Sequence, residues 1–273
     1  MICKTIDLWG EFPCVNKGND GFRPTLETYI LKGDKIRGAV LICPGGAYSF
    51  TSPREAEPIA IKFNAAGFNA FVLNYSVAPN KHPQSMMDAS RAMCIIRENS
   101  KEWNIDASKV AVCGFSAGGH LAANLGVNWD KDYLKDIPGI KPGNNNPNAL
   151  ILCYPVITSG KYAHTGSIYN LIGEDGDKSL EQEMSLELSV SKKTPPTFLW
   201  HTFADNAVPV ENSLLFAQAL RSENIPFELH IFPDGPHGLS LANEETTENG
   251  GKVYPNVAVW INLCITWLTN QFI

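Results

Sequence analysis

The chain has 273 residues, of which 44% are hydrophobic and 18% are charged, and its formal net charge is -6. This balance is typical of a folded globular chain rather than a disordered one, and the length predicts a single domain over residues 1–273. The negative net charge and the lack of a Lys/Arg-rich run argue against nucleic acid and membranes as partners.

The first residues and the cysteines bear on location. Residues 1–7 lack the long apolar stretch and the small-residue cleavage site of a signal peptide. Among the seven cysteines, Cys43, Cys113 and Cys153 fall in predicted strands, where a small buried hydrophobic residue is the natural interpretation. Because the number of cysteines is odd, we expect no disulfide framework, and we predict a cytoplasmic protein.

Strand-like and helix-like patterns alternate along most of the chain. The runs typical of strands cover residues 4–9, 26–31, 39–43, 70–75, 110–115, 150–154, 197–203 and 227–232. The helical patterns cover residues 55–66, 84–100, 117–127, 211–223 and 256–270. Alternation of this kind predicts an α/β fold with a mostly parallel eight-stranded sheet flanked by helices on both faces. No helix separates the first two strands, so we expect antiparallel pairing there.

Two connections are longer than the rest. Residues 128–148 are polar and rich in turn-forming residues, which is typical of a surface loop. Residues 156–196 separate the sixth and seventh strands and contain a weak helical pattern over residues 179–188. A connection of that length in a compact domain is usually a lid or a binding loop, so we predict a small lid-like insertion that rims a pocket.

The most informative motif is Gly114-Phe115-Ser116-Ala117-Gly118, which lies between a predicted strand and a predicted helix. Strand, G-x-S-x-G and helix make up a nucleophile elbow, in which a sharp turn raises the serine oxygen above the end of a sheet. The flanking glycines are needed because a side chain there would collide with the neighbouring strand and helix. The context therefore predicts that Ser116 is a nucleophile.

An acid and a histidine follow in the order that this kind of hydrolase requires. Asp205 comes directly after the seventh predicted strand, and His237 lies in the loop after the eighth. Because the carboxyl ends of parallel strands meet at one edge of a sheet, we expect Ser116, Asp205 and His237 to converge there as a catalytic triad. Asp234 lies on the same loop as His237 and is the weaker alternative for the acid.

A glycine-containing loop after the third strand is the candidate oxyanion hole. Its sequence is Pro44-Gly45-Gly46-Ala47-Tyr48, and glycines let backbone N–H groups approach a ligand oxygen. We expect one donor at the N–H of Ala117 and a second at Gly46 or Ala47. We also predict that Gly45 and Tyr48 contact the substrate and that residues 162–172 form a further part of the pocket wall.

The remaining histidines have weaker claims to a role. For His120, on the helix after the nucleophile, a structural hydrogen bond and a place in the pocket wall are both open. His201 and His230 fall within strands and are predicted to be core histidines. His82 and His164 are loop residues with no evident partner. No His/Cys/Asp grouping has metal-ligand spacing, so we predict no metal.

Together these motifs resemble those of the α/β-hydrolase superfamily, and the likeness extends from about Thr25 to the C-terminus. More narrowly, the chain is similar to small bacterial acetyl esterases known as acetyl xylan esterases or endoxylanase B, which are related to hormone-sensitive-lipase-like and feruloyl-esterase-like enzymes. Supporting stretches include Arg54-Glu55-Ala56-Glu57-Pro58. One departure concerns the oxyanion loop, which begins His-Gly-Gly-Gly in the larger lipase group and has Pro44 and Ala47 at the first and fourth positions here.

The resemblance implies a cofactor-free serine esterase that hydrolyses short acyl esters, often acetyl groups on sugars. The expected partner is therefore a small acyl ester. Two other functions stay open. A related serine hydrolase could act on amides, as aryl formamidases and prolyl oligopeptidases do. The chain could also be a non-catalytic binding module. Such relatives usually lose a triad residue, whereas this chain keeps all three candidates.

Overall fold

A computed structural model describes residues 1–10, 12, 21–174, 176–247 and 251–273. Their strands form one eight-stranded sheet with the order β1-β2-β4-β3-β5-β6-β7-β8. The strands are β1 (Ile2–Asp7), β2 (Thr25–Ile30), β3 (Arg37–Cys43), β4 (Asn69–Asn74), β5 (Ile105–Phe115), β6 (Ala149–Cys153), β7 (Thr197–Thr202) and β8 (Phe227–Phe232). The pairs β1/β2 and β2/β4 are antiparallel and all others are parallel. The predicted mostly parallel sheet is confirmed, including the antiparallel start.

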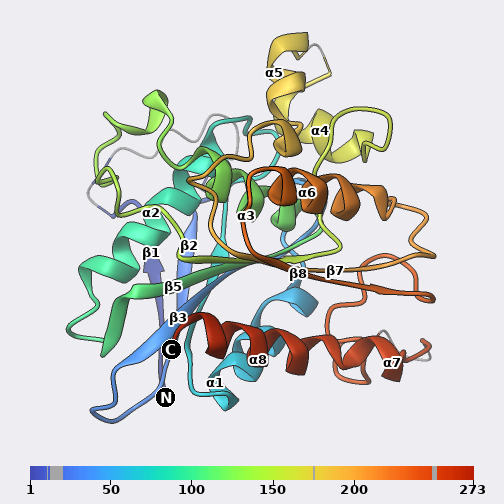
Figure 1. The fold of residues 1–273 in the computed structure, drawn as a ribbon. Coiled ribbons are helices and arrows are strands. Elements are labelled where there is room, and N and C mark those ends of the chain that lie inside the picture. The colour runs from blue at the N-terminus through green and yellow to red at the C-terminus, as the bar shows by residue number, and fades with distance from the viewer. Residues whose placement is uncertain (11, 13–20, 175, 248–250) are drawn as a thin grey trace.

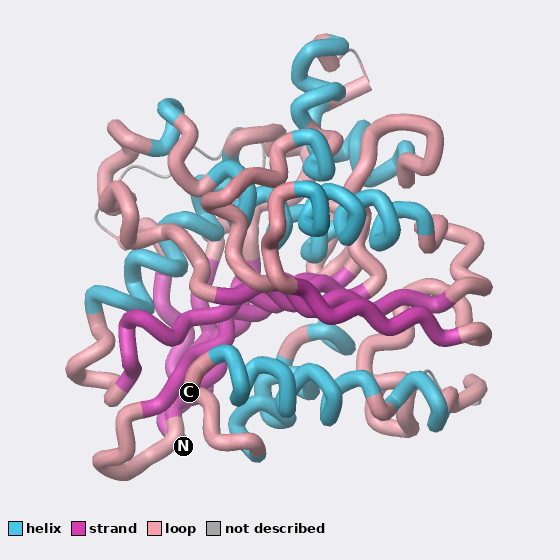
Figure 2. Tube along the Cα trace, viewed as in Figure 1, coloured by secondary structure: helices cyan, strands magenta, loops and turns pink. Residues whose placement is uncertain are grey.

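Helices cover both faces of this sheet (Figures 1 and 2). Helices α2 (Gln84–Glu98), α3 (Ala117–Asn128) and α6 (Glu211–Ser222) lie on one face, and α1 (Glu57–Ala65), α7 (Pro255–Ala258) and α8 (Trp260–Gln271) lie on the other. Short 3-10 helices cover Pro53–Glu55 (η1), Asp132–Leu134 (η2) and Leu186–Leu188 (η3). None of the described helices combines the length and the apolarity needed to cross a bilayer.

Residue alternation along the central strands explains this layering. In β3, Val40 and Ile42 pack into the core that includes α1 and α8, whereas Leu41 and Cys43 pack into the core that includes α2 and α3. Successive side chains of a strand point to opposite faces, so a strand that is apolar at every position is buried on both. A continuous apolar run is thus the signature of a strand between two helix layers.

The segment between β6 and β7 is more structured than a loop. It contains α4 (Thr165–Ile172), α5 (Lys178–Glu183) and η3, on the same side of the sheet as α3 and α6 (Figure 1). The single helical stretch expected over residues 179–188 is divided between α5 and η3, and α4 was not predicted. Ile168, Leu171 and Leu186 pack into the core, which anchors the segment. That it acts as a lid stays a prediction.

Candidate active site

Ser116 lies on the sharp turn between β5 and α3. Its backbone angles are φ 53° and ψ -119°, outside the regions that L-residues favour, a conformation that costs roughly 1–3 kcal/mol and that the surrounding structure must enforce. A Cβ on Gly114 would lie 2.1 Å from the carbonyl oxygen of Gly118, and one on Gly118 would lie 2.1 Å from that of Cys43. The two flanking glycines are therefore required by backbone contacts, as the motif predicts.

The structure brings Ser116, Asp205 and His237 together. The Oγ of Ser116 lies 2.7 Å from Nε2 of His237, and Nδ1 of His237 lies 2.6 Å from Oδ2 of Asp205. A carboxylate can only accept, so Nδ1 carries the hydrogen and Nε2 is free to accept the hydroxyl proton of Ser116. Asp234, the alternative acid, is exposed and makes no hydrogen bond to His237.

Asp205 is held as a carboxylate by its neighbours. Burial acts to raise its pKa, but hydrogen bonds to His201 and His237, the charge that His237 carries when protonated and the N–H of Val208 outweigh burial and hold the pKa well below its usual range. Its Oδ1 accepts from the N–H groups of Ala207 and Val208 at 3.0 Å and 2.9 Å. An acid fixed in this way can orient a histidine and stabilise its protonated form.

His201 is buried, as expected for a core histidine, but it also contacts the acid. Its Nε2 lies 2.9 Å from the carbonyl oxygen of Val208 and 3.3 Å from Oδ2 of Asp205. Since both groups accept, Nε2 carries the hydrogen, and Nδ1 accepts from the hydroxyl of Ser213 at 2.8 Å. His201 therefore supports the Asp205 loop from beneath, whereas His230 bonds Glu228 on the edge strand β8.

The predicted oxyanion loop faces Ser116. Gly46 has φ 132° and Ala47 has φ 53°, and a Cβ on Gly46 would lie 2.1 Å from the carbonyl oxygen of Phe50. Both residues line a cavity with Ser116, and neither of their N–H groups donates to another described residue. Ala117 is the first residue of α3, where an N–H has no partner within the helix. Three N–H groups are thus available around the serine.

Three residues expected to contact substrate lie below the loop instead. The N–H of Gly45 donates to Oε2 of Glu55 at 2.7 Å. The hydroxyl of Tyr48 bonds Nδ1 of His120 at 2.9 Å, and Nε2 of His120 bonds the carbonyl oxygen of Met184 at 3.0 Å. All are buried and none lines the cavity. The expectation for Gly45, Tyr48 and His120 is corrected: the positive φ of Tyr48 turns its side chain into the core, where it supports the loop.

The cavity beside Ser116 has a volume of about 230 Å³. Its lining residues are Gly46, Ala47, Phe50, Ser52, Arg54, Glu55, Ser116, His164, His237 and Gly238. Phe50 and His164 were not predicted to line it, although His164 falls in the wall segment 162–172. No local motif marks either residue. Long-range packing brings His164 to Ser116, whereas Phe50 follows the oxyanion loop closely and is hydrogen-bonded to Gly46.

Glu55 also lines the cavity, and the sequence motifs did not assign it a role. Its buried carboxylate accepts from the N–H of Gly45 and, at 2.6 Å, from the hydroxyl of Tyr154. The Tyr154 hydroxyl accepts in turn from the N–H of Ser240 at 2.8 Å. Burial raises the pKa of Glu55, and the hydrogen bonds from Tyr154 and Gly45 partly offset this. Glu55 thus connects the oxyanion loop to the segment that follows His237.

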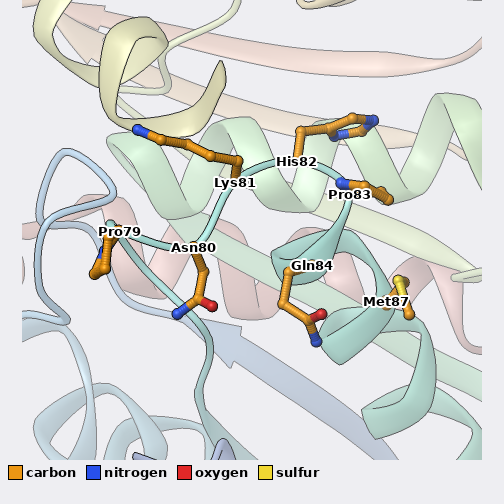
Figure 3. A pocket seen from close by; sticks show the side chains of 7 residues that line it. All are labelled: Pro79, Asn80, Lys81, His82, Pro83, Gln84 and Met87. Atoms are coloured by element: carbon orange, nitrogen blue, oxygen red, sulfur yellow. The ribbon is translucent and has the colours of Figure 1, made fainter. Parts of the chain in front are cut away.

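A second cavity lies away from Ser116. A cavity of about 300 Å³ is lined by residues 79–84 and Met87, at the start of α2, and shares no residue with the cavity beside Ser116 (Figure 3). Within the described part of the chain, no group of three or more His, Cys, Asp or Glu side chains is placed to hold a metal ion.

Residues 29–220 match the model of the BD-FAE family. The chain belongs to this family. Together with similar solved structures, this match confirms the resemblance to the α/β-hydrolase superfamily recognised in the motifs. Among solved structures, the acetyl ester-xyloside bifunctional hydrolase of Caldicellulosiruptor lactoaceticus has a TM-score of 0.88 and 43% identity, covering 98% of this chain and 96% of that one.

Two curated relatives of this BD-FAE chain are longer proteins. It is 40% identical over 243 residues to the endo-1,4-beta-xylanase B of Butyrivibrio fibrisolvens, covering 88% of this chain and 38% of that protein. It is 32% identical over 209 residues to the acetylxylan esterase of Xylanibacter ruminicola, covering 74% of this chain and 41% of that protein. The chain therefore spans less than half the length of each.

Proposed function

We propose that this protein is a serine esterase that hydrolyses short acyl esters, with acetyl esters of sugars as the natural class of substrate. The observation that carries the proposal is the continuous hydrogen-bonded line from Ser116 through His237 to Asp205, at 2.7 Å and 2.6 Å. Distances of this size place nucleophile, base and orienting acid within reach of one another. The acetylxylan esterase and acetyl ester-xyloside hydrolase among its relatives support the acyl group and the sugar.

The mechanism follows from which groups hold protons. Ser116 attacks the ester carbonyl while Nε2 of His237 takes its proton, and the resulting imidazolium then protonates the leaving alcohol. Asp205 keeps His237 in the productive tautomer and stabilises its positive charge. The carbonyl oxygen, now negative, accepts from the N–H of Ala117 and from that of Gly46 or Ala47. Water then repeats the cycle on the acyl-enzyme. No step requires a cofactor.

We infer ester rather than glycoside hydrolysis at this cavity, although two relatives carry xylanase or xyloside in their names. Glycoside hydrolysis ordinarily uses a pair of carboxyl groups on either side of the scissile bond. Among the described residues lining the cavity, Glu55 is the single carboxylate, and both of its oxygens already accept hydrogen bonds. The residues present thus fit acyl transfer.

Labelling of Ser116 and measurement of ester turnover together test this proposal. p-Nitrophenyl acetate should be hydrolysed, an organophosphate should abolish turnover by modifying Ser116, and Ser116→Ala should lower kcat by on the order of a million-fold. Circular dichroism of Ser116→Ala checks that the fold is unchanged. Substantial turnover by the pure Ser116→Ala protein would contradict the mechanism.

A further inference from the structure

His164 lines the cavity with Ser116, and one of its two ring nitrogens has no hydrogen-bond partner among the described residues. Its Nδ1 lies 3.3 Å from the N–H of Ser167 and 2.8 Å from the Ser167 hydroxyl, so the ring caps the start of α4. A backbone N–H can only donate, and Nδ1 must therefore accept. In the neutral ring the hydrogen then resides on Nε2.

The environment of the ring favours its neutral form, in which Nε2 carries the hydrogen. Burial, followed by the positive charge of His237, lowers the pKa of His164, and the charge of Asp205 only partly offsets this. Within the described residues Nε2 has no hydrogen-bond partner, yet it is not among the buried unpaired atoms. Since His164 lines the cavity, its Nε2–H is a donor that a bound molecule can use.

An exposed aromatic ring lines the same cavity. Phe50 is 56% exposed, and the N–H of Phe50 donates to the carbonyl oxygen of Gly46 at 3.2 Å. Its backbone is therefore fixed to the oxyanion loop while its side chain faces solvent at the cavity. Aromatic rings present flat apolar surface against which a sugar ring can pack.

We propose that His164 and Phe50 form a subsite for the leaving alcohol and that His164 selects alcohols carrying a further hydroxyl group near the ester. An acetyl group offers no acceptor beyond the carbonyl oxygen, which the oxyanion N–H groups occupy. A donor at His164 therefore serves the alcohol half, and a ring hydroxyl is the acceptor it fits. The inference rests on the proposed esterase function and names its substrate class as the acetylated cyclic polyol.

The experiment compares two acetyl esters of similar size. Methyl xylopyranoside monoacetate carries ring hydroxyls, whereas cyclohexyl acetate carries none. The measured quantity is the ratio of kcat/KM for the sugar ester to kcat/KM for the cyclohexyl ester. The loss of one neutral hydrogen bond corresponds to a change in this ratio of about three- to tenfold.

Two substitutions distinguish the two roles of His164, the hydrogen-bond donor at Nε2 and the cap of α4 at Nδ1. His164→Asn places an amide oxygen where Nδ1 accepts from Ser167, because asparagine is a good N-cap, but it removes the donor at Nε2. His164→Gln extends its amide N–H toward the position of Nε2. We expect His164→Asn to lower the ratio about three- to tenfold and His164→Gln to keep it within about twofold of the wild type. His230→Asn, on the edge strand β8, is the matched control and should leave the ratio unchanged.

The outcomes distinguish this proposal from the esterase function itself. Wild-type protein that hydrolyses neither ester, nor p-nitrophenyl acetate, overturns the esterase function. Wild-type protein that hydrolyses both, with a ratio unchanged in His164→Asn, overturns only the subsite. An equal loss on both esters in His164→Asn also overturns it, because His164 would then act on the chemistry or the fold rather than on the alcohol.

Discussion

The hydroxyl of Tyr154 donates a 2.6 Å hydrogen bond to Oε1 of Glu55, and both groups are buried beneath the active site. Through this bond, the loop that holds Gly46 and the segment that follows His237 share one polar network. The ring of Tyr154 also meets that of His237 edge to face, with centroids 5.1 Å apart. The groups that would bind the oxyanion and the group that would move the proton are thus positioned against a common support.

We predict that Tyr154→Phe lowers both activity and stability. It leaves Oε1 of Glu55 and the N–H of Ser240 without a partner in the interior, a loss of about 1–3 kcal/mol for an unsatisfied buried group. Urea titration measures the stability, and p-nitrophenyl acetate turnover measures kcat. Tyr29→Phe is the matched control, because Tyr29 also bonds a glutamate, Glu27, but on β2 near the sheet edge. Equal losses of kcat in both variants would contradict a specific role for Tyr154.

The two candidate acids should respond very differently to amidation. Asp205→Asn should lower kcat by on the order of ten-thousand-fold, because the amide favours the unproductive imidazole tautomer. Asp234→Asn changes an exposed residue of the same charge and should cost less than about threefold, in line with other surface substitutions. Steady-state kinetics on a short acyl ester measures both. The reverse order of losses would make Asp234 the acid.

Stability should fall on mild acidification because His120 is buried in its neutral form. Burial lowers its pKa to about 4, against 6.5 for the unperturbed group, and the hydrogen bond to Met184 offsets this only in part. Between these two values the unfolded chain binds a proton that the folded chain does not, so the free energy of unfolding decreases as the pH is lowered through this window. The slope contributed by one such group is at most about 1.4 kcal/mol per pH unit.

Urea unfolding at several pH values from 7 to 4 measures this dependence. In His120→Asn the amide oxygen can still accept from the hydroxyl of Tyr48, but the titrating group is gone, so the pH dependence should be shallower than in the wild type. His82, whose pKa burial also lowers to about 4, is unchanged in that variant and accounts for part of the remaining slope. Identical slopes in the two proteins would show that His120 does not contribute.

Acyl preference should follow the size of the cavity. Its volume of about 230 Å³ would have to accommodate both the acyl group and part of the alcohol. Each further methylene of the acyl chain must find buried space or force strain. We therefore expect kcat/KM to be highest for acetyl or propionyl and to fall toward octanoyl in a series of p-nitrophenyl esters. A maximum at octanoyl would indicate a long apolar channel and a lipase-like enzyme.

The protein should hydrolyse esters faster than amides. p-Nitrophenyl acetate and a formylated aniline separate the two activities, because an amine is a poorer leaving group and needs protonation by His237 as it departs. We expect the ester to be hydrolysed faster by at least two orders of magnitude, a difference in activation free energy of about 2.7 kcal/mol. A faster reaction with the amide would assign the chain to the amide-hydrolysing relatives instead.

The sequence by itself determined the strands of the sheet and the order of the candidate catalytic residues along them. Apolar runs such as residues 39–43 predict buried parallel strands, because a strand covered on both faces must be apolar at every position. Ser116 directly follows such a strand, and Asp205 and His237 lie in the loops after two further parallel strands of the pattern, β7 and β8. The carboxyl ends of parallel strands meet at one edge of the sheet. These predictions depend on patterns within a few neighbouring residues, which can be read from a single sequence.

Only the tertiary structure decided what surrounds Ser116. Tyr48 and His120, which are close in the chain to predicted active-site groups, turn into the core and bond each other at 2.9 Å. His164 and Phe50, which carry no motif, line the cavity. The wall of a cavity consists of side chains from segments far apart in the chain. Which of them face it depends on backbone turns such as the positive φ of Tyr48, and on packing between helices, neither of which leaves a local pattern in the sequence.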